Sequence, residues 1–162
     1  MFMIDFRVIR ASLVMVANTG VLITGKPGVG KSMATLELGL RGHQVVCDEL
    51  VRVHTSFNGI AVGEPVDCNP KIEVRGLGIF NLRDLLPEVL RQSSEIALVC
   101  ELVQFQEDRD LGRITPEMEE VELLGVAVPR YRVPVASGFS PASLIEILVR
   151  FHKKGDRQQS ER

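Results

Sequence analysis

The segment Gly25–Ser32 has the residue types and the spacing of a phosphate-binding loop. Its sequence, Gly-Lys-Pro-Gly-Val-Gly-Lys-Ser, fits the pattern Gly-x-x-x-x-Gly-Lys-Ser. In such a loop the glycines let successive backbone N–H groups converge on phosphates, the lysine reaches the terminal phosphates, and the serine hydroxyl ligates magnesium. The pattern therefore predicts a nucleotide site with Lys31 and Ser32 in these roles. The residues expected to contact the nucleotide are Gly25, Pro27, Gly28, Val29, Gly30, Lys31, Ser32 and Met33.

The sequence on either side of this phosphate loop supports the same interpretation. Val21–Thr24 is of strand type and leads directly into the first glycine, and Ser32–Leu40 has the apolar spacing of a helix. Arg41 and Gly42 then provide a cation and a glycine suited to the end of a helix. The alternative is a glycine-rich turn without a ligand, but a purely structural turn does not require the ammonium group of Lys31.

A pair of acidic residues follows the next predicted strand. Gln44–Cys47 indicates a buried strand, and Asp48 and Glu49 stand at its end. If this strand is parallel to Val21–Thr24, both end at the edge of the sheet where ligands bind. A carboxylate there can bind magnesium through water or take a proton from an attacking hydroxyl. We expect one of the two acids to face the phosphates and the other to be solvated; a plain surface turn is the alternative.

A second pair of charged residues lies on the alternating strand Lys71–Arg75. Glu73 and Arg75 are two positions apart and so share one face. Their spacing alone is equally compatible with a cross-strand ion pair and with a place in the site. The other expected elements are strands over 13–16, 51–55, 59–62, 95–103, 122–125 and 131–135, helices over 82–90 and from 140 onward, and loops over 63–70 and 105–120, the latter exposed.

Length predicts a single domain, and the strand, loop and helix around the phosphate loop indicate the α/β class. The 162 residues are 45% hydrophobic and 25% charged, and the formal net charge is −2. This charge argues against nucleic acid or an anionic membrane as the main partner, and no segment predicts a membrane span or a signal peptide. The three cysteines are widely spaced and indicate reduced core thiols in a cytoplasmic protein. We expect the domain to cover 1–152 and a disordered tail to cover 153–162.

The same motifs resemble a known family. The phosphate loop, the acidic pair and the string Glu73-Val74-Arg75-Gly-Leu-Gly-Ile79 are similar to the catalytic domain of the bacterial HPr kinase/phosphorylase. Val128–Val135 is similar to the late strands of that family. The resemblance extends from about Ile9 to Phe151 and is to a compact version without the amino-terminal domain of the longer relatives.

This resemblance implies a P-loop-containing mixed sheet related to the phosphoenolpyruvate carboxykinases, in a single domain. It implies a kinase that uses ATP, or sometimes pyrophosphate, with Mg²⁺ to phosphorylate a serine of HPr, a small phosphocarrier protein of the phosphotransferase system. A reverse phosphorylase reaction and a hexameric assembly are further implications. By resemblance, Lys31 holds the terminal phosphates, Asp48 is the base, Ser32, Glu73 and Asp48 bind the metal, and Arg75 lies near the phosphates or the acceptor.

The sequence also departs from the family pattern at three places. Arg10 stands where the family carries a histidine that assists the catalytic acid, and an arginine cannot exchange a proton near neutral pH. Glu49 replaces the second residue of an Asp-Asp pair, and 137–140 lacks a basic residue that the family tends to carry. Two alternatives therefore stay open: a nucleotide-binding regulatory module without efficient transfer, and a kinase of another peptide or small-molecule acceptor.

Overall fold

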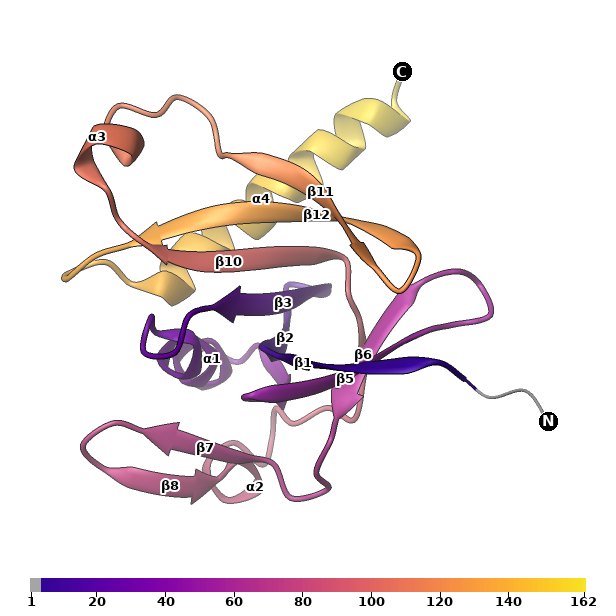
Figure 1. The fold of residues 1–162 in the computed structure, drawn as a ribbon, viewed down its shortest axis with the longest axis vertical. Helices are drawn as coiled ribbons and strands as arrows, with labels where there is room; N and C mark the ends of the chain where they lie inside the picture. The colour runs from indigo at the N-terminus through magenta and orange to yellow at the C-terminus, as the bar shows by residue number, and fades with distance from the viewer. Residues whose placement is uncertain (1–3) are drawn as a thin grey trace.

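The computed structural model describes residues 4–162 and arranges them in three layers (Figure 1). A six-stranded sheet in the order β11-β12-β10-β3-β2-β4 lies in the middle, and a four-stranded sheet in the order β1-β5-β6-β9 packs against one face. Helices α1 and α4 cover the other face. The strands of the six-stranded sheet are β2 (Ser12–Val16), β3 (Thr19–Gly25), β4 (Gln44–Cys47), β10 (Leu98–Gln104), β11 (Met118–Leu123) and β12 (Val126–Val135).

The four-stranded sheet and a separate hairpin complete the strands. The four-stranded sheet consists of β1 (Phe6–Arg10), β5 (Leu50–Thr55), β6 (Ala61–Pro65) and β9 (Ser94–Glu95), and the hairpin consists of β7 (Lys71–Val74) and β8 (Gly78–Asn81). The helices are α1 (Lys31–Leu40), α2 (Leu82–Leu85), α3 (Glu107–Asp110) and α4 (Pro141–Ser160). The predicted mixed α/β sheet is thus confirmed.

Strand direction brings four loops to one edge of the six-stranded sheet. β10 is parallel to β3, and β12 is parallel to β10. β2 is antiparallel to both β3 and β4, so β4 runs in the same direction as β3, as expected. The phosphate loop, the Asp48–Glu49 corner and the loops after β10 and β12 therefore meet at the carboxyl edge, where open α/β sheets bind ligands.

Alternation along the strands builds two separate cores. Val14, Val21 and Ile23 point toward α1 and α4 and pack with Leu38. Their neighbours Leu13 and Leu22 point the other way, into the core shared with the four-stranded sheet. Because β3 is buried on both faces, its sequence is almost continuously apolar. This double burial holds the start of the phosphate loop rigidly.

The strands expected over 13–16 and 21–24 form a hairpin that leads into the phosphate loop. β2 and β3 are joined by Ala17 and Asn18, which both adopt positive φ (47° and 65°). This conformation matches the right-handed twist of the strands, and asparagine tolerates it well. α1 likewise ends at the predicted glycine: Gly42 has φ 93°, and the N–H of His43 donates to Leu38 O at 3.0 Å.

Several element boundaries differ from the expectations. β6 continues to Pro65, into the expected loop 63–70, and β8, a strand that was not predicted, precedes the helix expected over 82–90. α2 ends at Leu85, because Pro87 disfavours the helical conformation of the residue before it. The expected strand 95–103 is two strands, β9 and β10, that belong to different sheets.

The second half of the chain contains more regular structure than predicted. The expected loop 105–120 holds α3 and the start of β11, and β12 begins at Val126, before the predicted 131. β12 lies between two strands, although prolines in sheets are usually confined to edge strands and bulges. Each proline nevertheless sits where β12 is paired on one side only: Pro129 opposite β11 and Pro134 opposite β10. A missing N–H is tolerated at such positions.

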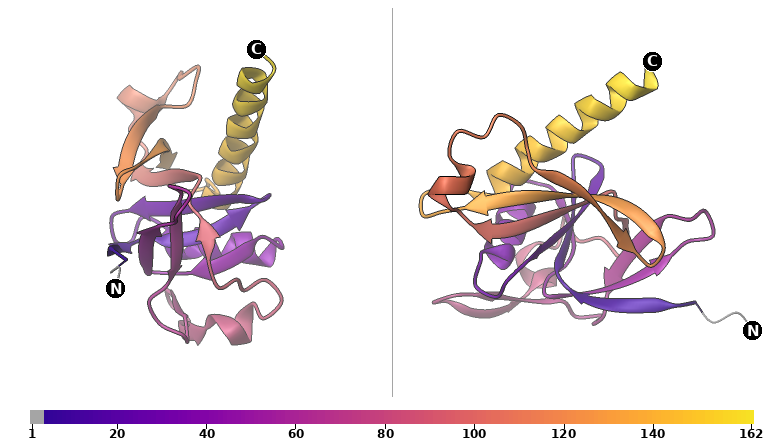
Figure 2. Two further views of the ribbon diagram at one scale, coloured as in Figure 1. Left: turned by 90° about the vertical axis from the view of Figure 1, so that its right-hand side faces the viewer. Right: turned by 45° about the horizontal axis from the view of Figure 1, so that its top comes forward.

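Helix α4 is longer than predicted. Ser140 caps it through a 3.2 Å hydrogen bond from the Ser143 N–H, and the helix continues to Ser160, through most of the tail expected to be disordered. Its last turns project beyond the sheet (Figure 2). None of the helices formed by residues 4–162 has the length and apolar content of a membrane span. Residues 1–3 of the expected domain lie outside the described residues.

The cysteines follow the expectation in part. Cys47 and Cys100 are buried, and burial raises the pKa of each thiol to about 12. Cys68 is exposed instead of lying in the core, because it falls in the turn between β6 and β7. All three are free thiols.

Candidate active site

The phosphate loop presents backbone N–H groups at the start of α1. Gly30 is the N-cap of α1 with φ 119°, a conformation that residues with a Cβ rarely adopt, and it offers no side-chain acceptor to the helix. The first N–H groups of a helix have no partners within the helix and carry its partial positive charge. This end of α1 is thus suited to bind an anion.

Lys31 spans the loop with its ammonium group. Its Nζ donates hydrogen bonds to Gly25 O at 2.7 Å and Lys26 O at 3.1 Å. Burial lowers the pKa of Lys31 below its ordinary value, the charge of Asp48 opposes this shift, and Arg10 reinforces it. A carboxylate and a guanidinium thus lie in electrostatic range of the ammonium group that is predicted to hold the terminal phosphates.

Asp48 faces the loop and accepts two hydroxyl hydrogen bonds. Ser32 Oγ donates to Oδ2 at 2.7 Å, and Ser12 Oγ donates to Oδ1 at 2.6 Å. Ser12 belongs to β2 and is completely buried. Hydrogen bonds to an ionised acceptor are the stronger kind, and two of them fix the carboxylate plane. The aspartate of the acidic pair is therefore the one aimed at the site, as expected for one of the two.

The neighbouring Glu49 is turned away into solvent. It has φ 75°, and the Leu50 N–H donates to Asp48 O at 3.0 Å across it, which forms a tight three-residue turn. The Ala11 N–H holds Glu49 O at 3.0 Å. Glu49 Oε1 lies 3.9 Å from Arg10 Nη1, and both side chains are more than 70% exposed at 72% and 78%. Such an exposed ion pair contributes little to stability.

The guanidinium of Arg75 lies beside the phosphate loop, whereas the position of Glu73 does not assign that residue a role in the site. A Cβ built on Gly28, whose φ is 81°, would lie 3.4 Å from Nη2 of Arg75. This guanidinium is therefore next to the loop, although the two residues are far apart in sequence. Among residues 4–162 no ion pair joins Glu73 to Arg75, so their side chains do not form the simple pair considered above. Glu73 is exposed on β7, which packs beside α1.

The donors present suit a magnesium ion bound together with phosphates. In the described part of the chain no three His, Cys, Asp or Glu side chains come together as a metal cluster. Mg²⁺, however, is usually bound through one or two protein oxygens plus waters and substrate phosphates. The adjacent oxygens of Ser32 and Asp48 fit that chemistry, and Glu73 stays a predicted third ligand.

A cavity of about 1320 Å³ extends from the phosphate loop along the carboxyl ends of β10 and β12. Its walls combine the loop with side chains from β10, β12 and the segments that follow them; they include Pro27, Gly28, Gln104, Phe105, Ser137 and Phe139. The site thus has two sides. Asp48 and Ser32 lie toward β4, and the open cavity lies toward β12.

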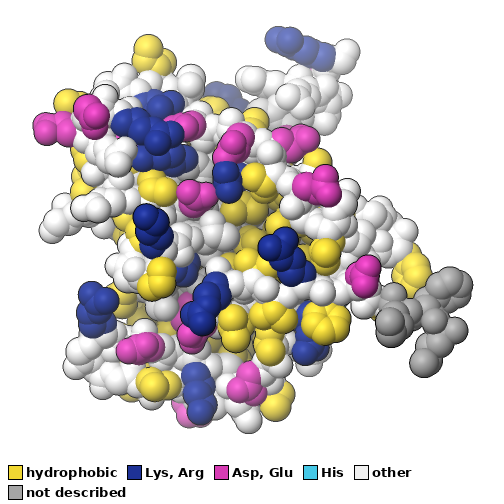
Figure 3. Space-filling view, viewed as in Figure 1, with side chains coloured by type: hydrophobic (Ala, Val, Ile, Leu, Met, Phe, Trp, Pro, Cys, Tyr) yellow, Lys and Arg dark blue, Asp and Glu magenta, His cyan; other side chains and the backbone are white. Residues whose placement is uncertain are grey.

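Mixed charges line the far rim of the cavity. Figure 3 shows basic side chains with acidic ones around them over the part of this face where Figure 1 shows α3 and β12. Arg132 is paired with the buried Asp110, which also accepts the Gln106 N–H at 2.7 Å. Burial alone would raise the pKa of Asp110, but hydrogen bonds from Arg132 and Gln106 hold it below its ordinary value. This pair pins α3 against β12.

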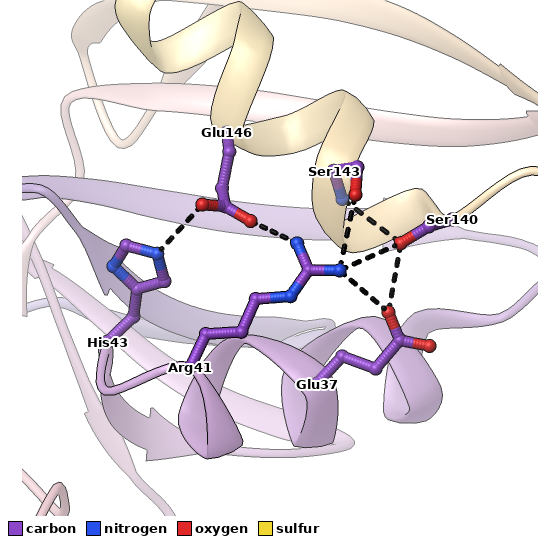
Figure 4. Close-up of polar contacts among 6 residues, drawn as sticks. All are labelled: Glu37, Arg41, His43, Ser140, Ser143 and Glu146. Atoms are coloured by element: carbon purple, nitrogen blue, oxygen red, sulfur yellow. Dashed lines mark hydrogen bonds and ion pairs between the residues drawn. The ribbon is translucent and has the colours of Figure 1, made fainter.

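A polar cluster fixes the helix that begins in the phosphate loop (Figure 4). Arg41, at the end of α1, pairs with Glu146 and lies 3.3 and 3.2 Å from the hydroxyls of Ser140 and Ser143 at the start of α4. Ser140 Oγ also donates to Glu37 at 2.9 Å. The cation predicted for the end of α1 thus crosslinks two helices, and α1 cannot shift without breaking these contacts.

Sequence reasoning missed three parts of this site. Ser12 carried a weak signal, a hydroxyl residue directly before an apolar strand, but its partner Asp48 lies 36 positions away. The Asp110–Arg132 pair and the edge-to-face contact between the rings of Phe105 and Phe139 join segments whose spatial order follows only from the sheet. The residues predicted from the phosphate loop, by contrast, all lie in the loop or in the first turn of α1.

Comparison with known proteins identifies relatives of this chain. Residues 3–161 match the family model "HPr Serine kinase C-terminal domain". A protein named HPr kinase/phosphorylase from Streptococcus thermophilus is 38% identical over 140 residues, which are 85% of this chain and 45% of that protein. One of the same name from Geobacter sulfurreducens is 35% identical over 146 residues, which are 89% of this chain and 46% of that protein.

A solved structure matches the fold. The Hpr(Ser) kinase/phosphatase from Coxiella burnetii superposes with a TM-score of 0.82 at 31% identity, covering 93% of this chain and 99% of that one. This chain spans about half the length of the curated relatives it matches. The match of nearly the whole chain to the family, together with this shared fold, shows that the chain belongs to the HPr serine kinase C-terminal domain family.

Proposed function

We propose that the chain is an ATP- and Mg²⁺-dependent protein serine kinase that acts on HPr or an HPr-like phosphocarrier protein. The observation that carries this proposal is the position of Asp48, which is hydrogen-bonded to Ser32 at 2.7 Å beside the ammonium of Lys31. The side chains predicted to act as base, metal ligand and phosphate-binding cation thus lie together at one end of α1. The family membership supports the choice of acceptor.

The residues present can carry out each part of a phosphoryl transfer. The loop N–H groups, Lys31 and Arg75 would hold the phosphates. Ser32, with Asp48 and Glu73, would hold Mg²⁺, which would supply charge neutralisation to those phosphates. Asp48 accepts the proton of the acceptor serine hydroxyl, and the serine oxygen forms a bond to the γ-phosphorus. The bond between that phosphorus and the β–γ bridging oxygen breaks, which releases ADP. Two hydroxyls occupy two of the roughly four lone-pair sites of Asp48, which leaves room for this proton.

The presence of Arg10 instead of a histidine affects the phosphorylase reaction, the reverse of the kinase reaction. Phosphorolysis of phosphoserine requires Asp48 to return a proton to the serine oxygen, and a histidine nearby could supply one near neutral pH. Arg10 lies within electrostatic range of Lys31, but a guanidinium group cannot supply a proton near neutral pH. We therefore propose a forward kinase with weak phosphorylase activity. A cytoplasmic location and a hexameric assembly are proposed from the family alone.

A nucleotide-dependent regulatory module is the second candidate. Arg10 in place of a proton-exchanging residue and Phe139 in place of a basic one favour it. This module would bind ATP and ADP through the same loop and would change a partner instead of phosphorylating it. A kinase of another peptide or small molecule would share the site and differ in the loops around the cavity, because acceptor choice resides in such loops.

Transfer and binding assays separate these functions. The full chain is incubated with Mg²⁺, γ-labelled ATP and HPr, beside Lys31→Ala and Asp48→Asn variants, and ATP affinity is measured for each. The kinase predicts labelled HPr with the wild type only. ATP binding should be weakened strongly by Lys31→Ala and to a smaller extent by Asp48→Asn, which removes one predicted Mg²⁺ ligand. ATP binding without labelling of HPr would reject the HPr kinase and leave the regulatory module or a kinase of another acceptor. Labelling by Lys31→Ala would refute the assigned site.

A further inference from the structure

Two phenylalanines meet in the cavity next to the phosphate loop. Phe105 follows β10 and Phe139 precedes α4, and their rings pack edge to face, with centroids 5.7 Å apart at 81°. Phe105 is half-buried, whereas 48% of Phe139 is exposed. Both line the same cavity as Gly28 and Pro27 of the phosphate loop. A large aromatic ring is therefore held in place by a second ring and still presents surface to the cavity.

The layout of the site determines where a bound nucleotide can extend. Its terminal phosphates belong at Lys31, and the groups that serve the transferred phosphate, Asp48 and Ser32, lie on the β4 side of the loop. The acceptor must approach on that side to reach Asp48. The cavity opens on the opposite side, over β10 and β12, and has room for a ligand at about 1320 Å³. The ribose and base of the nucleotide are therefore directed toward Phe105 and Phe139.

The chemistry of this end of the cavity suits a nucleobase. Phenylalanine rings stack on the flat face of any base, which gives affinity with little selectivity among bases. Gln104, Gln106 and Ser137 line the same cavity and can donate or accept hydrogen bonds at the edge of a base. We propose that Phe139, supported by Phe105, forms the nucleobase subsite of this chain. This inference rests on the proposed nucleotide-binding function and adds the part of the site that distinguishes a nucleoside triphosphate from its phosphates alone.

The test compares ATP with inorganic tripolyphosphate, each titrated calorimetrically in the presence of Mg²⁺. Phe139→Ala should weaken ATP binding roughly tenfold, as expected for loss of one stacking partner, and leave tripolyphosphate binding unchanged. Phe139→Tyr, which keeps the ring, should bind ATP like the wild type, and Phe139→Leu should resemble Phe139→Ala. Phe57→Ala is the matched control, because Phe57 is fully exposed at the tip of the β5–β6 hairpin. Thermal melts verify that each variant is folded.

The outcomes separate the subsite from the function on which it rests. Tripolyphosphate that fails to bind the wild type overturns the phosphate loop assignment and the subsite with it. Tripolyphosphate binding together with equal ATP affinity of the wild type and Phe139→Ala overturns the subsite alone. If Phe139→Ala leaves ATP affinity intact but raises the KM for HPr, the ring contacts the acceptor protein, and the nucleobase assignment is wrong.

Discussion

The hydrogen bond from Ser12 to Asp48 gives the most specific prediction about the site. Ser12→Ala removes a completely buried hydroxyl that donates to a carboxylate at 2.6 Å. Hydrogen bonds to charged groups contribute about 1.5–3 kcal/mol to stability. Because Asp48 is only partly buried, water can replace part of the loss, and we expect about 1.5–2 kcal/mol. For a chain of this size that corresponds to a fall in Tm of about 3–8 °C.

The same change should impair transfer without impairing nucleotide binding. Without Ser12, one oxygen of Asp48 loses its donor, and the carboxylate keeps only Ser32 to orient it. A catalytic group displaced by about 1 Å can cost on the order of 100-fold in rate. We therefore expect kcat for the phosphorylation of HPr to fall roughly 10- to 100-fold, with the Kd for ATP unchanged. Ser12→Thr keeps the hydroxyl and should restore most of the rate.

Ser94→Ala is the matched control for this experiment. Ser94 is also buried, but its hydroxyl donates at 2.8 Å to the backbone oxygen of Glu95, a neutral acceptor. Its loss should cost about 1 kcal/mol and leave kcat unchanged. Urea denaturation and steady-state kinetics measure both effects. If the two alanine variants lose equal stability and keep equal rates, Ser12 does not position Asp48.

Two further predictions concern the rim of the cavity and the metal. Arg132→Gln leaves the carboxylate of Asp110 buried without its cation, so the free energy of unfolding at pH 7 should fall by about 3 kcal/mol. Because the pKa of Asp110 is lowered in the folded protein, the pair stabilises the wild type at pH values above the unfolded pKa of about 3.9. This contribution is lost as the pH falls through the pKa that Asp110 has in the folded protein. Urea denaturation should therefore show the gap between wild type and variant closing below about pH 4; a constant gap contradicts the pairing. Glu73→Gln should weaken Mg²⁺ binding in the presence of ATP roughly tenfold, with stability changed by less than about 0.5 kcal/mol because Glu73 is exposed. Unchanged Mg²⁺ affinity would remove Glu73 from the metal site.

Local chemistry explains which parts of the site could be predicted from the sequence. The phosphate loop requires glycines, Lys31 and Ser32 in consecutive positions, so its structure is encoded within one short segment. The orientation of Asp48 followed from a single assumption, that β4 runs parallel to β3. The sheet satisfies it through the intervening antiparallel strand β2. The prediction that Asp48 faces the site thus depended mainly on the direction of one strand.

The features that were missed depend on contacts between distant segments. The start of β12 and the existence of β8 could not be inferred from short alternating runs, because prolines and glycines there gave stronger signals for loops. The extended α4 has few buried residues after Val149 to reveal its helical period. Ser12, Phe105 and Phe139 acquire roles only when the sheet order places β2 beside β4 and β10 beside β12. These roles follow from the topology, and no local sequence pattern indicates them.

Occupation of the phosphate loop by ATP is the claim on which the account depends most. The direct measurement is a titration of the isotope-labelled chain with Mg²⁺ and ATP, followed through the backbone amide resonances of Gly28–Ser32. We predict large, saturable shifts of these amides that are absent in Lys31→Ala, while amides in the β5–β6 hairpin stay in place. Amides of the loop that do not respond at millimolar ATP would contradict the account.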